Sequence, residues 1–370
     1  MIFVSFIIAL VIILTFLDDK RMLKNGMSIG FFVLTVVFVI RYGYGSDYFS
    51  YYDHFLCITK SSSLQAAFDN DSMEKGWIIL CWLLKPLGFQ SLIVLQTVIT
   101  NYIIYYLIRK HVSRGWRWFA VSFYLLNPMI FLLNLSMLRQ GLAQILFLLA
   151  VDLAYEKRIV LPLLLIFIAF SFHNSALIAI PFLILAYFSS NKTVVSLTLL
   201  TILLSAIILY IKPDVSSIAF NYILLNDAFN DTYGYYFDLS DQLEMSSGLG
   251  FLIQILAVVP LFFCFKQFDS FFKITFVNYL TFIVFTLLAF QVLMINRISS
   301  YFMSFGILLF PMYYQAIIAK HKTTLINNKA NSFLALGSFS LVLFYNVYAY
   351  FEFFKSATYG WAYVNFHTIL

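Results

Sequence analysis

Long apolar runs constrain what this chain can fold into more than any other feature of its sequence. The chain is 62% hydrophobic and 11% charged, with a mean hydropathy of +0.89. A soluble domain carries roughly 25% charged residues, so this chain has too few charges to cover a water-facing surface. The apolar runs are continuous rather than alternating, which favours spanning helices over a strand barrel. We therefore expect an all-α polytopic membrane protein.

A helix that crosses a bilayer needs about 20 mainly apolar residues. The chain of 370 residues then forms one integral-membrane domain over residues 1–370, with about twelve transmembrane helices. The first apolar run lacks a basic region and a cleavage site, so we interpret it as a retained span. The expected spans are 1–17, 27–41, 89–108, 118–134, 138–155, 159–172, 174–189, 193–211, 248–265, 274–294, 298–318 and 332–350. Segment 76–89 is too short to cross and contains Pro86, which indicates an interfacial or re-entrant helix.

Basic residues lie mainly in alternate connecting segments, so the positive-inside rule makes these segments cytoplasmic. Both termini then lie on the periplasmic or extracytoplasmic side, together with two sizeable outer loops, 42–76 and 212–247. The net charge of +6 is divided among short clusters and therefore does not indicate nucleic acid. The basic segments hold Lys20, Arg21, Lys24, Arg109, Lys110, Arg114, Arg117, Lys157, Arg158, Lys192, Lys266, Lys273, Lys320, Lys322 and Lys329.

Four cationic or proton-accepting residues, far apart in the sequence, are predicted to converge on the outer membrane interface. Arg41 ends the second span and begins the stretch RYGYGSDYFSYYDHF, and Arg139 begins the fifth span. His173 lies at the turn of a helical hairpin, and Arg297 lies in another turn. Each has an ordinary alternative, because a single interfacial arginine often serves as an anchor and a lone histidine often caps a helix. Charges near a membrane interior are costly, however, and tend to mark binding pathways.

These residue types suit a lipid diphosphate and an activated hydroxyl group. The planar arginine fork binds phosphate oxygens bidentately. Histidine accepts a proton near neutral pH, which makes His173 a candidate general base. Asp47 and Asp53 could orient that base or bind sugar hydroxyls, or could be ordinary solvated loop residues. Aromatic faces for stacking on sugar rings are offered by Tyr42, Tyr44, Tyr48, Tyr51 and Tyr52, although interfacial packing is the usual role of such residues.

Five motifs in this order resemble the EpsG-like group of Wzy-type polysaccharide polymerases. They are RYGYGSDYFSYY (41–52), EKGW (74–77), LRQGLAQ (138–144), FHNSALIAIP (172–181) and NRISSYF (296–302). The resemblance covers about residues 30 to 310. It implies a GT-C-like fold and an enzyme of the bacterial inner (plasma) membrane whose active site faces the periplasm or extracytoplasmic side. The reaction would move a glycan en bloc from undecaprenyl diphosphate to a hydroxyl of the next lipid-linked repeat unit.

The resemblance also implies partners and roles. The donor and acceptor would both be undecaprenyl-diphosphate-linked oligosaccharides in a lipid bilayer, with a chain-length regulator protein as a further partner. The enzyme would be inverting and would need no metal or cofactor. His173 would be the general base, with Arg139 and Arg297 at the leaving diphosphate. The expected substrate-binding residues are Arg41, Asp47, Tyr48, Tyr52, Asp53, Glu74, Gln140, Asn174 and Tyr301.

Other functions remain open from the sequence. An O-antigen ligase, or another lipid-linked glycan transferase, would use the same donor chemistry with a different acceptor. A lipid-linked oligosaccharide flippase or another transporter would be expected to carry midplane charges and internal repeats, which we do not detect. Three cysteines, Cys57, Cys81 and Cys264, have neither a disulfide pattern nor metal-ligand spacing, so we predict neither. The sequence contains no nucleotide-binding motif.

Overall fold

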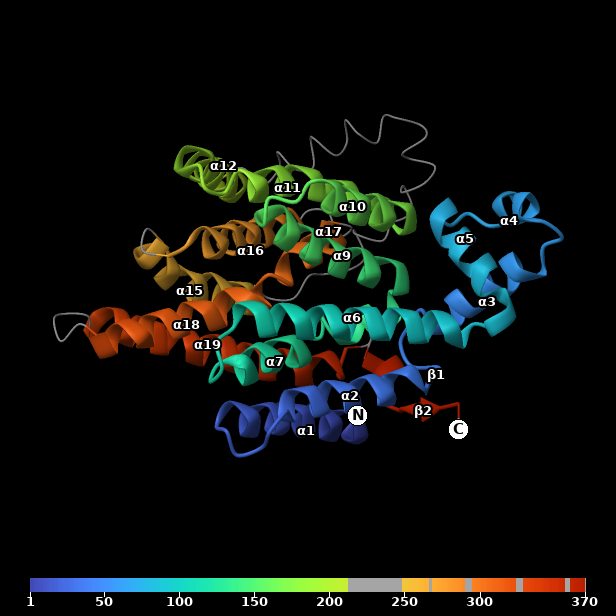
Figure 1. Ribbon diagram of the computed structural model, residues 1–370, viewed down its shortest axis with the longest axis horizontal. Helices are drawn as coiled ribbons and strands as arrows, with labels where there is room; N and C mark the ends of the chain where they lie inside the picture. The colour runs from blue at the N-terminus through green and yellow to red at the C-terminus, as the bar shows by residue number, and fades with distance from the viewer. Residues whose placement is uncertain (212–247, 266–267, 290–294, 324–328, 357–359, 370) are drawn as a thin grey trace.

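The computed structural model describes residues 1–211, 248–265, 268–289, 295–323, 329–356 and 360–369, and the described part is mainly helical. Figure 1 shows the long helices running roughly along the longest axis, with α3, α4 and α5 gathered at one end. The helices of the first half are α1 (Ile2–Asp19), α2 (Gly26–Val39), α3 (Tyr48–Lys60), α4 (Leu64–Asn70), α5 (Lys75–Leu84), α6 (Gln90–His111), α7 (Arg117–Leu126), α8 (Leu132–Ser136) and α9 (Leu138–Tyr155).

The second half continues the bundle. Its helices are α10 (Val160–Phe172), α11 (Ile180–Tyr187), α12 (Lys192–Ile211), α15 (Leu249–Cys264), α16 (Ser270–Ala289), α17 (Ile295–Met303), α18 (Gly306–Thr323) and α19 (Lys329–Phe353). Short 3₁₀ helices cover Lys85–Leu87, Asn174–Ala179 and Gly360–Tyr363. Within the described residues, five helices are long and apolar enough to cross a membrane, namely α1, α6, α9, α16 and the Phe333–Phe353 part of α19. Shorter apolar helices accompany them, so the chain has the character of a multi-pass membrane protein.

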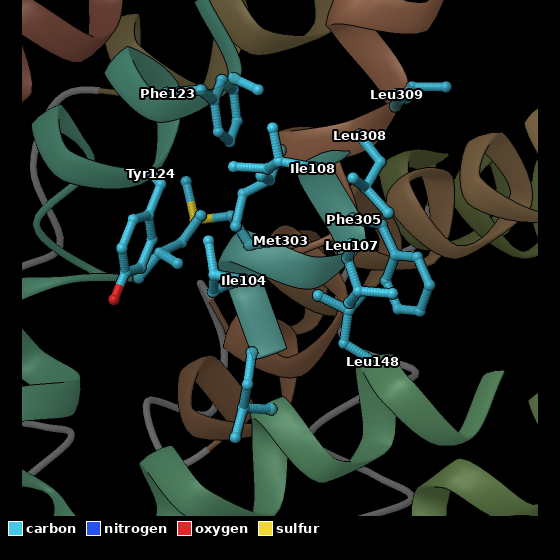
Figure 2. Close-up of a cluster of buried hydrophobic side chains, with 14 of the residues drawn as sticks. Ile104, Leu107, Ile108, Phe123, Tyr124, Leu148, Met303, Phe305, Leu308 and Leu309 are labelled. Carbon is cyan, nitrogen blue, oxygen red and sulfur yellow. The ribbon is translucent and has the colours of Figure 1, made fainter. Parts of the chain in front are cut away.

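The long helices do not have one apolar face and one polar face, as the helices of a soluble bundle do. In α1, Val4, Ile7 and Val11 face the core, while Phe6 and Ile13 on other faces are 63% and 54% exposed. Exposed apolar side chains of this size suit a lipid surround rather than water. Part of the core lies where α6, α7, α9, α17 and α18 meet (Figure 2). Its members include Ile104, Leu107, Ile108, Phe123, Tyr124, Leu148, Met303, Phe305, Leu308 and Leu309.

Three predicted spans are interrupted, which corrects the expectation of single helices there. Span 118–134 is divided into α7 and α8, because Pro128 disfavours a helical conformation at Asn127 before it. Span 174–189 begins as a 3₁₀ helix and continues as α11 from Ile180, with Pro181 in the first turn. Span 298–318 is divided near Gly306, where a Cβ would lie 2.4 Å from the Phe123 ring.

The two ends of the bundle differ in composition. One end, here called the basic end, carries segments 20–25, 109–117 and 156–159. There Asp152 pairs with Lys110 and His111, and the His111 ring stacks on Phe271 with 3.8 Å between centroids. Asp152 therefore acts as a structural counter-charge for the end of α6. The opposite end, here called the motif end, carries four of the five motifs and the start of the fifth.

Both termini lie at the motif end (Figure 1). Strand β1 (Arg41–Tyr42) pairs antiparallel with β2 (His367–Thr368), and the amino group of Met1 donates to Val364 O. The predicted outer loop 42–76 is largely the helices α3 and α4, and 76–89 forms α5 and the 3₁₀ helix Lys85–Leu87 at Pro86. The predicted outer loop 212–247 lies outside the described residues.

Candidate active site

The segment of α3 to α5 is held against the bundle by its own small core at the motif end. Tyr51 of α3 and Trp77 of α5 are buried in this core, as are Leu138 and Leu142 of α9. The Trp77 ring makes edge contacts with Tyr51 and with Phe172 of α10, each with 5.9 Å between centroids. Trp77 therefore joins three elements that are distant in the sequence. Glu74, just before α5, is fixed at their junction.

Gly76 lets α5 approach α10 closely. A Cβ at this position would lie 2.3 Å from Ser171 Oγ and 2.7 Å from Ser171 O. Any larger residue would therefore force the two helices apart, because a backbone oxygen cannot move away as a flexible side chain can. The EKGW motif thus supplies a carboxylate, a close helix contact and an anchoring ring within four residues.

Glu74, Arg139 and His173 meet at this junction and form one cluster. The Glu74 carboxylate pairs with the Arg139 guanidinium at the start of α9. Its Oε1 lies 3.3 Å from His173 Nδ1 and also accepts the Asn174 backbone N–H at 3.3 Å. The side chains of Glu74, Arg139 and His173 are 14%, 22% and 19% exposed, respectively. The cluster is therefore fixed by its surroundings and still open to a ligand.

The electrostatics keep Glu74 ionised. Burial alone would raise the pKa of this carboxyl group. The hydrogen bond with His173 and the charge of Arg139 outweigh that effect and lower the pKa to about 2. Glu74 is therefore an anion at any physiological pH, and a neutral His173 ring would direct its Nδ1–H toward it.

Arg139 has a second partner in Tyr51. Its Nε lies 3.4 Å from the Tyr51 hydroxyl, and the guanidinium lies 5.7 Å from the Tyr51 ring centroid. The Glu74 and Tyr51 contacts use Nη1 and Nε. They orient the plane of the guanidinium, and a guanidinium carries five N–H donors in all.

The backbone carbonyl of Arg297 is bound by a side chain from the start of α9. Gln140, the residue after Arg139, donates to Arg297 O at 2.8 Å and to Ser300 Oγ at 3.0 Å. Gln144, one turn further along α9, also donates to Ser300 Oγ. These bonds hold the start of α17 against the start of α9, and the Arg297 side chain is exposed. The structure therefore brings Arg139 and His173 together at Glu74 and places the Arg297 backbone beside Gln140.

Arg41 does not join this exposed group, which corrects the expectation of a substrate contact. Its side chain is 0% exposed. Its guanidinium donates to Phe38 O, Leu135 O, Thr97 Oγ1 and Gln96 Oε1 at 2.7, 2.9, 2.6 and 3.1 Å. These acceptors use the N–H groups of both Nη atoms, which a diphosphate would need. Arg41 instead ties the end of α2 to α6 and α8.

The remaining predicted substrate residues are spread over the motif end. Asp47 bonds through its backbone N–H to Ser136 Oγ at 2.8 Å, and Tyr48 is buried against Phe89. Tyr52 is 39% exposed and packs edge-on against Phe89. Tyr301 is 0% exposed and shares a 3.0 Å hydrogen bond with Ser175, so stacking on a sugar is not its role in this structure. Gln140 is also buried, and its amide is used by α17.

Asp53 faces a separate opening. A cavity of about 980 Å³ lies between α3 and α4 and is lined by Asp53, His54, Phe68, Asn70 and Asp71, among others. The His54 ring and Asp71 pair at 2.7 Å. Asp71 precedes Glu74 by three residues in the sequence. Within the described ranges, no three His, Cys, Asp or Glu side chains gather in a way that could hold a metal ion.

Sequence reasoning missed the residues that support the site. Gln96 and Thr97, which bind Arg41, lie with Thr100 and Asn101 inside an apolar span, and this polar group was the available signal. It also missed Glu74 as the bridge between Arg139 and His173, because only the folded chain brings these motifs together.

Comparison with known proteins agrees with the motifs. A model of the EpsG family matches residues 24–362, nearly the whole chain. The chain belongs to the EpsG family. No curated protein and no solved structure matches it. Membership in the EpsG family suggests a polysaccharide polymerase-type role, and the family match spans every residue of the Glu74–Arg139–His173 cluster.

Proposed function

We propose that this EpsG-family protein is a glycosyltransferase that polymerises oligosaccharide repeat units carried on undecaprenyl diphosphate. The observation that carries the proposal is the Glu74–Arg139–His173 cluster, which joins three family motifs in a partly open site. Its membrane setting follows from the apolar helices. We place the protein in the inner (plasma) membrane with this site on the extracytoplasmic side, because the basic segments lie at the other end.

His173 is the proposed general base. When Nδ1–H donates to Glu74, the other ring nitrogen, Nε2, carries the lone pair that can take a proton. A carboxylate that orients an imidazole and stabilises its protonated form is a recurrent arrangement in hydroxyl activation. Nε2 would take the proton of the acceptor hydroxyl as its oxygen attacks the anomeric carbon of the donor. The bond from that carbon to the diphosphate breaks, and direct displacement inverts the configuration.

The arginines are proposed to receive the leaving diphosphate. Charge accumulates on its oxygens as the bond breaks, and donors already in place stabilise that charge most. Arg139 is oriented by Glu74 and Tyr51, and its remaining N–H groups can donate to a phosphate oxygen. Arg297 is proposed to bind the same group from the start of α17. Arg41 is left out of this step because its fork is occupied within the protein.

The cavity between α3 and α4 is proposed to hold sugar residues of the substrate. Its lining offers carboxylate, imidazole and amide groups together with the Phe68 ring. Such groups match the hydroxyls and the apolar faces of a sugar. Asp53 would then bind substrate, as the sequence analysis expects.

A reconstituted reaction tests the proposal. Lipid-linked repeat unit is extracted from a strain lacking this gene and incubated with the purified protein in detergent. The proposal expects a ladder of lipid-linked products that differ by one repeat unit, also after divalent ions are removed with a chelator. A ladder lost on chelation and restored by magnesium would contradict metal independence. Transfer of a single glycan to a different acceptor would indicate a ligase, and absence of any transfer would contradict glycosyltransferase activity.

A further inference from the structure

A second polar cavity lies at the basic end of the bundle. Its volume is about 200 Å³, and it is formed by the turn between α1 and α2, the end of α6 and the start of α7. Four cationic side chains line it, namely Lys24, Arg109, Arg114 and Arg117, together with the polar side chains of Asn25 and Ser28. None of these residues takes part in the proposed reaction.

Two of the arginines are held in place by the protein. Arg109 Nη1 donates to the Tyr105 hydroxyl at 2.7 Å, and this hydroxyl shares a 2.7 Å hydrogen bond with Ser28. Arg117 Nε donates to Val112 O at 3.1 Å, and its Nη2 donates to Arg109 O at 3.3 Å. Side chains fixed in this way lose less conformational entropy when they bind a ligand.

Positive charge in this cavity exceeds negative charge. Asp18 is the one carboxylate found in the lining, and its oxygens already bind Arg114 Nη2 at 2.8 Å and Met27 N–H at 3.1 Å. The neighbouring Asp19 accepts the Trp118 N–H at 2.9 Å. In the described part of the chain, neither Arg109 nor Arg117 forms an ion pair. Asp18 and Asp19 attract the Arg117 guanidinium without pairing with it, but four cationic side chains line the cavity against one carboxylate, so an anion would balance the excess positive charge.

Exposed apolar side chains on α2 and α6 indicate what kind of anion would bind. Ile29 and Phe32 of α2 are 43% and 70% exposed, and Tyr102 and Tyr106 of α6 are 66% and 37% exposed. These four residues lie within two turns of Ser28 on α2 or Arg109 on α6, and the two helices pack against each other. A ligand with a phosphate and acyl chains would match both parts.

We propose that the cavity formed by Lys24, Arg109, Arg114 and Arg117 binds a phosphate group, supplied by the headgroup of an anionic phospholipid. Guanidinium forks match phosphate geometry, and basic pockets between transmembrane helices on the cytoplasmic side bind lipid headgroups in other proteins. The positive-inside rule alone would predict exposed cations without a shaped cavity or fixed forks.

Native mass spectrometry of the purified full chain in detergent tests this proposal. Short-chain phosphatidylglycerol, phosphatidylcholine and inorganic phosphate are titrated separately, and the bound fraction gives each Kd. We expect one saturable phosphatidylglycerol site. Arg109→Gln and Arg117→Gln should each weaken it by about tenfold, since each removes a charged hydrogen-bond donor. Arg158→Gln is the matched control, because Arg158 lies at the same end, outside the cavity, and is 58% exposed.

The outcomes separate the sources of phosphate. Binding of phosphatidylglycerol with little binding of inorganic phosphate supports the headgroup, whereas equal binding supports free phosphate as the ligand of the same cavity. If a glutamine variant fails to fold, Arg117→Lys keeps the charge, loses the fork and should bind with intermediate affinity. Equal binding of phosphatidylcholine, or arginine variants that match Arg158→Gln, would overturn the proposal.

Discussion

Glu74 is the single residue on which the geometry of the candidate site depends most. It binds both Arg139 and His173, so its removal would free both side chains. We predict that Glu74→Gln lowers the initial rate of repeat-unit incorporation by about 10²-fold, since an unoriented base and a displaced guanidinium both weaken catalysis. Glu352→Gln is the control, because Glu352 is 41% exposed and pairs with Lys355 at the motif end. Equal rates for both variants would contradict this role.

The lowered pKa of Glu74 predicts how the stability of the protein depends on pH. Its pKa is lowered from 4.5 in the unfolded chain to about 2, so the folded protein favours the ionised form. The resulting stability is present above pH 4.5 and is lost as the pH falls toward 2. The difference in Tm between the wild type and Glu74→Gln should therefore shrink as the pH falls from 4.5 toward 2. A difference that stays unchanged over that range would contradict this assignment.

At the residue scale, the sequence predicted Arg139, His173 and Arg297 from their charge and their expected depth in the membrane. It could not show that Arg41 is buried, because the acceptors that surround it come from α2, α6 and α8. Glu74 was predicted as a substrate contact, and its pairing within the protein depends on tertiary packing. Side-chain partners of this kind are not set by local sequence.

At the scale of elements, the close approach of α5 to α10 determines where Glu74 lies. We predict that Gly76→Ala lowers the free energy of unfolding by about 1–3 kcal/mol, because the added methyl group overlaps with Ser171. Polymer formation should fall as well, since the shift of α5 moves Glu74. Gly337→Ala is the control, because no atom lies within 4 Å of its Cβ position in α19. Denaturant unfolding that shows equal stability of both variants would contradict the overlap.

The apolar runs predicted which segments are helices, but they predicted the breaks within those helices only in part. The predicted span 138–155 coincides with α9, and 193–211 agrees closely with α12. Pro128 is a sequence signal for the interruption at Asn127, although the run around it is hydrophobic. The division near Gly306 depends on contact with Phe123, a residue distant in the sequence, and so could not be read locally.

At the scale of the whole molecule, the motifs and the basic segments lie at opposite ends. Cys57 on α3 is exposed at the motif end. We predict that a membrane-impermeant maleimide labels the protein in intact spheroplasts and that Cys57→Ser abolishes the labelling. Cys81→Ser is the control, because Cys81 is buried and its loss should not change the labelling. Labelling of Cys57 only after the membrane is permeabilised would place the motif end in the cytoplasm.

The basic segments 20–25, 109–117 and 156–159 lie at one end of the bundle. The pairing of β1 with β2 was not predictable, because each strand has two residues and the tail has no recognisable motif. That pairing places the end of the chain beside Arg41, with Thr368 opposite it in the ladder. Contacts between remote, very short segments depend on the assembled bundle.

The most direct measurement is the rate of glycan transfer by His173→Ala, in the purified protein with lipid-linked repeat unit, relative to His367→Ala. Both histidines lie at the motif end, but His367 is exposed in β2 and outside the cluster. We predict a loss of about 10²–10⁴-fold for His173→Ala, with substrate binding retained, and an unchanged rate for His367→Ala. Product of normal length at a normal rate from His173→Ala would show that the Glu74–Arg139–His173 cluster is not where the hydroxyl is activated.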